Sequence, residues 1–214
     1  MRSGSTLLKA LIATRPDCSD LPETAFQNLD VIESDKRIIV LKKPAGYDEF
    51  SYPKIDSIDA KKIVLIRNPY DTVCSLMNMN VIRNQANSVF NNNLYLIAYW
   101  HMVYSNVIKK QILKGNNTLL VRYEELVENP IEESARVFRF IGTDFKEGTE
   151  SYSAPVNYNW TWRKDDGGDV IKTLKVRKPP IKQLNNNLLA FIESSPEIRS
   201  VLTYFGYTSA YGII

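Results

Sequence analysis

Residues 62–75 have the sequence KIVLIRNPYDTVCS, in which a short apolar run gives way to a polar turn. The run Lys62–Ile66 is rich in β-branched residues and predicts a buried strand. Asn68 can cap a helix, Pro69 suits the first helical position, and Asp71 follows at the third. The stretch therefore predicts a strand that leads through Arg67 directly into a helix.

The rest of the chain continues this alternation. Apolar runs predict two more strands, and apolar periodicity predicts further helices. The strands are expected at Arg37–Leu41 and Thr118–Val121, and the helices at Ser5–Arg15, at 89–113, at 130–141 and as a pair across 180–205. Strands separated by helices indicate an α/β fold of three layers, with a central parallel sheet flanked by helices. We expect one domain over residues 1–214.

Composition narrows the possible functions. The 214 residues carry a net charge of +3, less lopsided than is typical of nucleic-acid binders but compatible with a local pocket for a small polyanion. Two cysteines and one histidine favour neither a disulfide scaffold nor a metal site, so no metal is expected. No apolar run could span a membrane and no signal peptide is evident, so we expect a cytoplasmic protein.

The one histidine, His101, lies beside Trp100 in the middle of the helix predicted over 89–113. We interpret it as structural, because a lone helical histidine rarely does chemistry without a placed partner.

A polar cluster opens the first predicted helix. It consists of Arg2, Ser3, Gly4, Ser5 and Thr6. A helix N-terminus offers backbone N–H groups and a partial positive charge, glycine allows close approach, and the hydroxyls and arginine add donors. This N-terminal loop, residues 2–6, is a candidate phosphate or sulfate cradle. The alternative is a capped surface helix.

Two further clusters follow predicted strands. Arg67 and Ser75 could both donate to one phosphate, with Arg67 supplying a charge-assisted fork. Tyr123 begins the sequence YEELVENP and could contact a purine ring. Either cluster alone could be an ordinary strand–helix junction. In parallel sheets, however, ligands bind beyond the carboxyl ends of strands, where both clusters are expected.

Taken in order, the three clusters resemble the motifs of the sulfotransferases that use 3′-phosphoadenosine 5′-phosphosulfate (PAPS). The matching residues are 2–6, 67–75 and 123–130, and the ending Phe205-Gly206-Tyr207 is also similar. The resemblance implies the P-loop NTPase-like sulfotransferase fold. It implies that residues 2–6 hold the 5′-phosphosulfate, that Arg67 and Ser75 hold the 3′-phosphate, and that Tyr123 lies near the adenine.

The resemblance also implies catalytic roles. The N-terminal stretch is most similar to the tyrosylprotein and bacterial type, whose general base maps onto Glu23. Lys42, with Lys43 as the alternative, corresponds to the lysine that contacts the bridging oxygen. Arg163 and Lys164 loosely match a basic pair that closes over the 3′-phosphate.

These roles describe an in-line transfer of a sulfuryl group from PAPS to a hydroxyl or amine. Glu23 would take the acceptor's proton, while Lys42 and Arg2 would stabilise charge on the leaving 3′-phosphoadenosine 5′-phosphate (PAP). The expected partner is a small-molecule or polymer acceptor, without nucleic acid. One alternative is a decayed protein that binds PAP or PAPS without catalysis. Another is a nucleotide kinase or NTPase, against which the missing Walker A pattern argues.

In the family a buried strand normally precedes the N-terminal loop, whereas here Met1 directly precedes Arg2. We expect either that the natural chain begins further upstream or that the fold lacks this strand, whose loss would expose neighbouring edges. A chain extended upstream is expected to be more soluble and more active.

Overall fold

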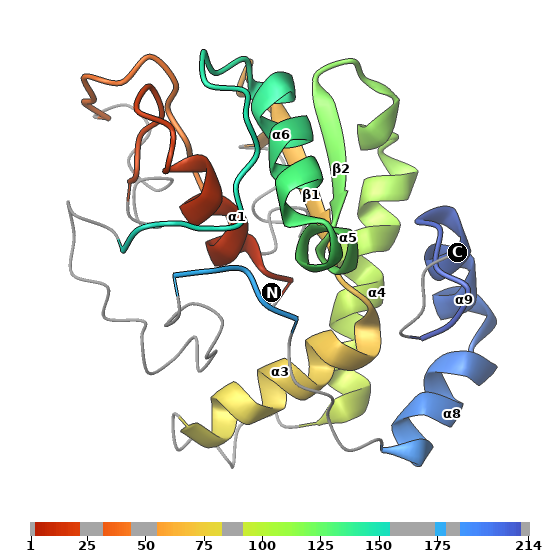
Figure 1. Ribbon diagram of the computed structural model, residues 1–214. Coiled ribbons are helices and arrows are strands. Elements are labelled where there is room, and N and C mark those ends of the chain that lie inside the picture. The colour runs from red at the N-terminus through yellow and green to blue at the C-terminus, as the bar shows by residue number, and fades with distance from the viewer. Residues whose placement is uncertain are drawn as a thin grey trace. The chain divides into compact units, whose positions relative to one another are not determined.

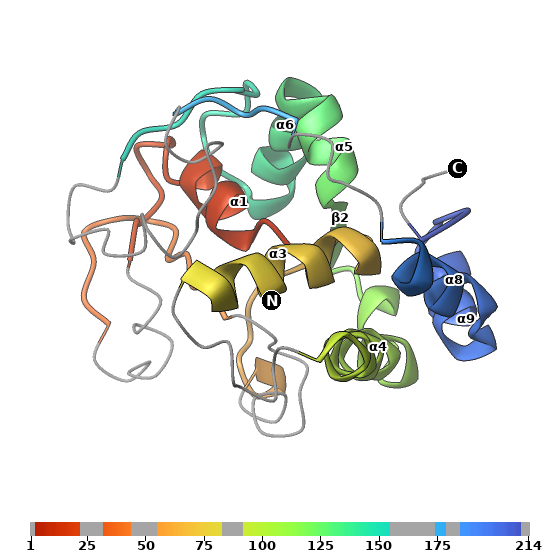
Figure 2. The same ribbon diagram turned by 90° about the horizontal axis from the view of Figure 1, so that it is seen from below.

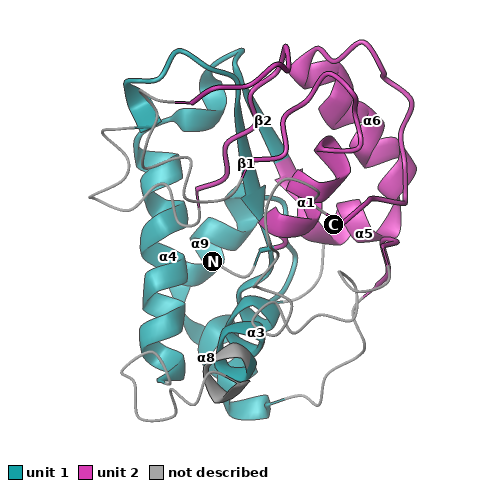
Figure 3. Cartoon of the chain, turned by 90° about the vertical axis from the view of Figure 1, so that its left-hand side faces the viewer, with its two compact units in different colours: residues 1–3, 45–120, 180–214 teal, residues 4–44, 121–179 magenta. Residues whose placement is uncertain are grey.

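The computed structural model describes residues 3–21, 32–43, 55–82, 92–154, 174–178 and 185–210. The chain divides into two compact units (Figure 3). Unit 1 comprises residues 1–3, 45–120 and 180–214, and unit 2 comprises residues 4–44 and 121–179. The expectation of a single domain over 1–214 stays a prediction.

The described sheet consists of β1 (Lys62–Ile66) and β2 (Thr118–Arg122), which pair side by side in parallel (Figure 1). The Lys62 N–H donates to the Asn117 carbonyl at 2.8 Å where the pairing begins. Val64 and Ile66 of β1 are buried, as their alternation predicts. Both strands confirm the sequence prediction.

Helices of unit 1 enclose its core. They are α3 (Pro69–Ile82), α4 (Asn93–Lys109), α8 (Asn186–Ser194) and α9 (Pro196–Tyr204), with a 3-10 turn, η3, at Ile112–Lys114. α4 packs against α3 and α9, and α8 packs against α9 and α3. Figure 2 shows α4 nearly end-on and α8 beside α9. The largest fully buried side chains here are Trp100, Tyr70 and Phe205.

The helix predicted over 89–113 is shorter in the structure. α4 ends at Lys109, and Gln111 has a φ of 52°, in the left-handed region. A residue in that conformation cannot continue a right-handed helix, so the chain resumes as the 3-10 turn η3.

Unit 2 contains α1 (Ser5–Ile12), α5 (Tyr123–Glu128) and α6 (Pro130–Ile141). α6 packs against both α1 and α5. It runs between Pro130 and Gly142 as predicted, and Gly142 ends it with a φ of 83°. α1 ends before the predicted Arg15, because the Thr14 hydroxyl and N–H both bond the Leu11 carbonyl at the last turn.

The strand predicted at Arg37–Leu41 is an extended segment with one parallel bridge, between Cys18 and Ile38. Ile38 bonds the backbone of Asp17 and Ser19. The next donor, the Val40 N–H, bonds the Ser19 hydroxyl at 2.7 Å instead of a carbonyl. A side chain thus takes the place of the next ladder bond, and the pairing stops.

Candidate functional site

The Arg67 segment, residues 67–75, is a strand-to-helix turn fixed by Asn68. The Asn68 side chain accepts from the Asp71 N–H at 2.8 Å, and its amide donates to the Asp71 carboxylate at 3.2 Å. The Asn68 carbonyl accepts from the Thr72 hydroxyl at 2.8 Å. These bonds satisfy the first turn of α3 and confirm the predicted start of the helix.

Arg67 is held close to this turn. Its side chain is only 7% exposed, and its Nη2 donates to the Asp71 carboxylate at 3.2 Å. Ser75 is half-buried and lies one turn beyond Asp71, on the same face of α3. The segment therefore presents a guanidinium and a hydroxyl from one short stretch of chain, as an anion site requires.

In unit 2, α1 begins without a side-chain cap. Gly4 occupies the N-cap position with φ 90° and ψ 14°, and its carbonyl accepts the first helical bond from Leu8 at 3.0 Å. The first turn carries no acidic residue. An uncapped, uncharged helix start of this kind leaves backbone N–H groups and the positive end of the dipole for an anion.

Tyr123 packs directly on Gly4. A Cβ atom added to Gly4 would lie 2.2 Å from Cδ2 and 2.6 Å from Cε2 of the Tyr123 ring, so no larger residue fits. Tyr123 is the first residue of α5 and is 6% exposed. Burial and the nearby Tyr123 raise the pKa of Tyr152 to about 12. The ring of Tyr123 thus lies in a packed environment against the N-terminal loop.

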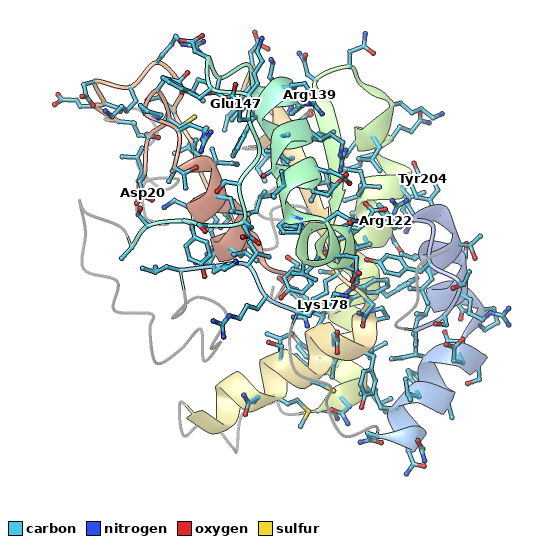
Figure 4. The ribbon with its side chains drawn as sticks, viewed as in Figure 1. Asp20, Arg122, Arg139, Glu147, Lys178 and Tyr204 are labelled. Carbon is cyan, nitrogen blue, oxygen red and sulfur yellow. The ribbon has the colours of Figure 1, made fainter. Side chains whose placement is uncertain are left out.

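Ion pairs hold α5, the helix that begins with Tyr123. Arg122 donates to Glu125 at 2.8 Å, and Lys178 pairs with Glu128 (Figure 4). The first pair is partly exposed and the second is exposed, so each adds little stability.

Lys42 contacts the start of α1. Its Nζ donates to the Thr6 hydroxyl at 2.5 Å, and the residue is half-buried, whereas Lys43 is exposed. Unit 2 therefore brings Gly4, Thr6, Lys42 and Tyr123 together around one helix N-terminus. The Thr6 hydroxyl, the Lys42 ammonium group and helix N–H groups can stabilise negative charge in this arrangement.

Sequence reasoning missed a buried lysine on α1. Lys9 is 7% exposed and forms an ion pair with Asp20. Its position between Leu8 and Ala10 in an apolar helix was the available signal, because a lysine there needs a buried partner. The pair fastens the loop after α1 to the helix that starts the candidate site.

Asp17 joins three segments of unit 2. Its carboxylate accepts from the Thr143 hydroxyl at 2.5 Å, from the Asp144 N–H at 3.1 Å and from Arg37 at 2.5 Å. Burial acts to raise the pKa of Asp17, but these hydrogen bonds outweigh it and lower the pKa to about 2. Burial, with the nearby charge of Asp17, raises the pKa of the Cys18 thiol to about 11. These groups serve structure at neutral pH.

A pocket of about 440 Å³ opens at the other end of α1. Ala10, Ala13, Cys18 and Asp20 line it, together with parts of 33–36 and 153–154. Figure 4 shows Asp20 on the loop that follows α1. The length of α1 separates this pocket from Gly4, so it is distinct from the N-terminal loop.

The structure describes only some of the remaining predicted residues. Ser3 is buried, at 7% exposure. Arg2, Glu23, Arg163 and Lys164 lie outside the described residues. His101 bonds Ser105, one turn along α4, at 3.1 Å. Within the described ranges, no group of three or more metal-ligating side chains comes together. Likewise, no described helix is long and apolar enough to cross a membrane.

A family model described as "Sulfotransferase domain" matches residues 1–157. The chain therefore belongs to the sulfotransferase family. The resemblance inferred from the three clusters is confirmed at this level.

Solved structures agree with the fold. A "Sulfotransferase Domain from the Curacin Biosynthetic Pathway" superposes with a TM-score of 0.68 at 14% identity, covering 100% of this chain and 95% of that one. A "Sulfotransferase Domain from the Synechococcus PCC 7002 Olefin Synthase" superposes with a TM-score of 0.62 at 19% identity, covering 96% and 91%. No curated protein sequence matches this chain. The predicted α/β sulfotransferase fold is thus confirmed.

Proposed function

We propose that this member of the family transfers a sulfuryl group from PAPS to a hydroxyl or amine acceptor. The observation that carries the proposal is the contact between Lys42 and Thr6 at the uncapped start of α1. It brings a cation to the helix N-terminus where the family motif has its anion loop. The same contact favours Lys42 over the exposed Lys43 as the catalytic lysine.

The donor would be held through its two phosphate ends. Residues Arg2 to Thr6 bind the 5′-phosphosulfate, using the N–H groups that Gly4 leaves accessible. Arg67 and Ser75 bind the 3′-phosphate, with Asp71 orienting the guanidinium. Tyr123 supports the loop through Gly4, in addition to the contact with adenine that the resemblance implies. Arg163 and Lys164 are proposed to close over the 3′-phosphate.

The reaction is an in-line displacement at sulfur. The acceptor oxygen bonds to sulfur as the bond from sulfur to the bridging phosphate oxygen breaks, and PAP leaves. Glu23 takes the acceptor's proton, and Lys42 with Arg2 stabilises the charge that develops on the bridging oxygen. The products are the sulfated acceptor and PAP. The donor needs no metal in this scheme.

The acceptor is proposed only as a class, a small molecule or polymer that bears a hydroxyl or amine. Structural neighbours at 14% and 19% identity support the fold and leave the acceptor open. A screen is therefore required. A cytoplasmic location likewise stays a prediction.

Calorimetry tests the donor site. PAP is titrated into the protein beside ATP, with Arg67→Ala as the matched variant. Tight PAP binding that is lost in the variant, with weak ATP binding, supports the proposal and justifies an acceptor screen with PAPS. If the folded protein does not bind PAP, the proposed function is wrong. PAP binding without turnover on any acceptor would favour the decayed binding protein, and magnesium-dependent ATP turnover would favour the NTPase.

A further inference from the structure

Two aromatic side chains of α4 hydrogen-bond to the end of β1 and to the residue just beyond it. The indole Nε1–H of Trp100 donates to the Arg67 carbonyl at 3.0 Å. The Tyr104 hydroxyl, one turn further along α4, donates to the Leu65 carbonyl at 3.0 Å. In an extended chain, carbonyls two residues apart point to the same side, so one helix face can reach both. α4 therefore holds the chain where the strand changes into the Arg67 segment.

Both donor side chains are buried, and the bond from Trp100 to the Arg67 carbonyl is itself buried. Trp100 is 0% and Tyr104 is 4% exposed, and their ring centroids lie 5.0 Å apart. Tyr104 also meets Phe205 of the core edge-on at 5.6 Å. A buried carbonyl that loses its donor has no water to replace it, so the bond from Trp100 strongly favours one position of the Arg67 backbone.

Arg67 is consequently held at two points. Trp100 bonds its backbone carbonyl, and Asp71 bonds its guanidinium at 3.2 Å. An arginine side chain is long and flexible, so binding an anion normally costs conformational entropy. Because the backbone and the guanidinium of Arg67 are both held before the anion binds, most of that cost is avoided. Within the pair, Trp100 hydrogen-bonds to the backbone of Arg67 itself, whereas Tyr104 hydrogen-bonds to the strand residue Leu65.

We propose that Trp100 is a positioning residue for the 3′-phosphate of the donor, acting through the Arg67 carbonyl. The inference rests on the proposed function, because it requires that Arg67 binds that phosphate. Trp100 touches neither donor nor acceptor in this scheme. It sets the position from which the Arg67 side chain extends, and so it determines how well the protein distinguishes PAP from adenosine 5′-monophosphate (AMP).

The test compares Trp100→Phe with Tyr104→Phe, which each remove one aromatic donor from α4. Affinities for PAP and AMP are measured by calorimetry. Trp100→Phe is expected to weaken PAP binding about tenfold and AMP binding less than about twofold. Tyr104→Phe is expected to lower the melting temperature while the ratio of the two affinities stays at the wild-type value. In an Arg67→Ala background, Trp100→Phe should have no further effect on PAP.

An equal loss for PAP and AMP in Trp100→Phe, or the same change of ratio in Tyr104→Phe, overturns the inference, since either would indicate lost stability alone. If Arg67→Ala itself leaves PAP binding intact, the role of Arg67 at the 3′-phosphate fails and the inference with it, whereas the proposed function fails only if the folded wild-type protein does not bind PAP. If Trp100→Phe does not fold, the indole N–H resonance of Trp100 is followed by NMR in the wild-type protein. The signal is assigned by substituting Trp160 and Trp162. A shift with PAP and none with AMP supports the inference, and identical spectra overturn it.

Discussion

The Arg67 segment of unit 1 and the start of α1 in unit 2 both follow the pattern of an anion site, yet they are held by different forces. Hydrogen bonds fix the Arg67 segment: Asn68 caps α3 and Trp100 bonds the Arg67 carbonyl. The start of α1 depends mainly on packing, where the ring of Tyr123 lies against Gly4, with one hydrogen bond from Lys42 to the Thr6 hydroxyl.

The difference determines which substitutions each region can tolerate. A hydrogen-bonded turn is sensitive to the loss of a donor or acceptor even when volume is kept. A close-packed glycine is sensitive to added volume, whatever its polarity. The two regions can therefore be perturbed separately with small changes.

The largest effect is expected at the lysine beside the N-terminal loop. Lys42→Ala should lower kcat for sulfuryl transfer about 10²–10³-fold, because it removes a cation from the leaving group, and should change PAP affinity much less. Single-turnover kinetics with PAPS measures the step. Lys43→Ala is the matched control and should stay close to wild type. If Lys42→Ala and Lys43→Ala lower kcat by similar factors, Lys42 is not the lysine that stabilises the leaving group.

A substitution at Gly4 tests whether packing holds the start of α1. Gly4→Ala should weaken PAP binding and destabilise the fold by about 2–4 kcal/mol, since φ 90° is strained for alanine and the new methyl group meets Tyr123. Urea unfolding and calorimetry measure both effects. In a Tyr123→Ala background, which lacks the ring, Gly4→Ala should weaken PAP binding less than it does in the wild-type protein. An equal loss in the two backgrounds would mean that strain at residue 4, and not the ring, limits the site.

Asp17 offers a second test of the comparison, because at this residue unit 2 is held by hydrogen bonds and not by packing. A pKa lowered from 3.8 to about 2 means that the charged carboxylate stabilises the fold above about pH 4, and that this contribution is lost as pH falls toward 2. Asp17→Asn should cost about 1.5–3 kcal/mol at neutral pH by weakening bonds to a charged acceptor. Its unfolding free energy should fall less steeply between pH 4 and 2 than that of wild type. If the unfolding free energies of Asp17→Asn and wild type depend on pH in the same way, the charge of Asp17 does not contribute to stability.

The smallest effect is expected from the cap of α3. Asn68→Ala should cost about 1 kcal/mol of stability and weaken PAP binding several-fold, because the turn that carries Arg67 loosens. Asn185 caps α8 in the same way, accepting from the Leu188 N–H at 3.1 Å, and lies in no candidate site. Asn185→Ala should therefore lose comparable stability with PAP affinity unchanged. If the two substitutions weaken PAP binding equally, the lost affinity reflects lower stability of the whole protein and not a looser Arg67 segment.

Sequence reasoning succeeded where the signal is local. The start of α3 at Pro69 depends on Asn68 and Asp71, and the limits of α6 depend on Pro130 and Gly142, all within a turn of the helix ends. The family and fold followed from ordered motifs of the same local kind. Such signals need no knowledge of which segments later meet.

Contacts between distant residues could not be predicted. Nothing near Gly4 indicates that Tyr123 will pack on it, and nothing near Arg67 indicates that Trp100 will bond its carbonyl. The strand expected at Arg37–Leu41 failed for a related reason, because Ser19, from another segment, takes the Val40 N–H. Tertiary packing decides such cases, and β-propensity is too weak to override it.

The two hydrogen bonds from α4 to the end of β1 also constrain how this helix can change over evolution. Sliding α4 by one residue would rotate its side chains by about 100°, which would swing Trp100 and Tyr104 away from both carbonyls together. An insertion or deletion between Trp100 and Tyr104 would therefore break at least one bond, whereas one before Asn92 or after Lys110 can leave both in place. A change of length in those flanking segments would leave the axial register of α4, and with it the position of Arg67, unchanged.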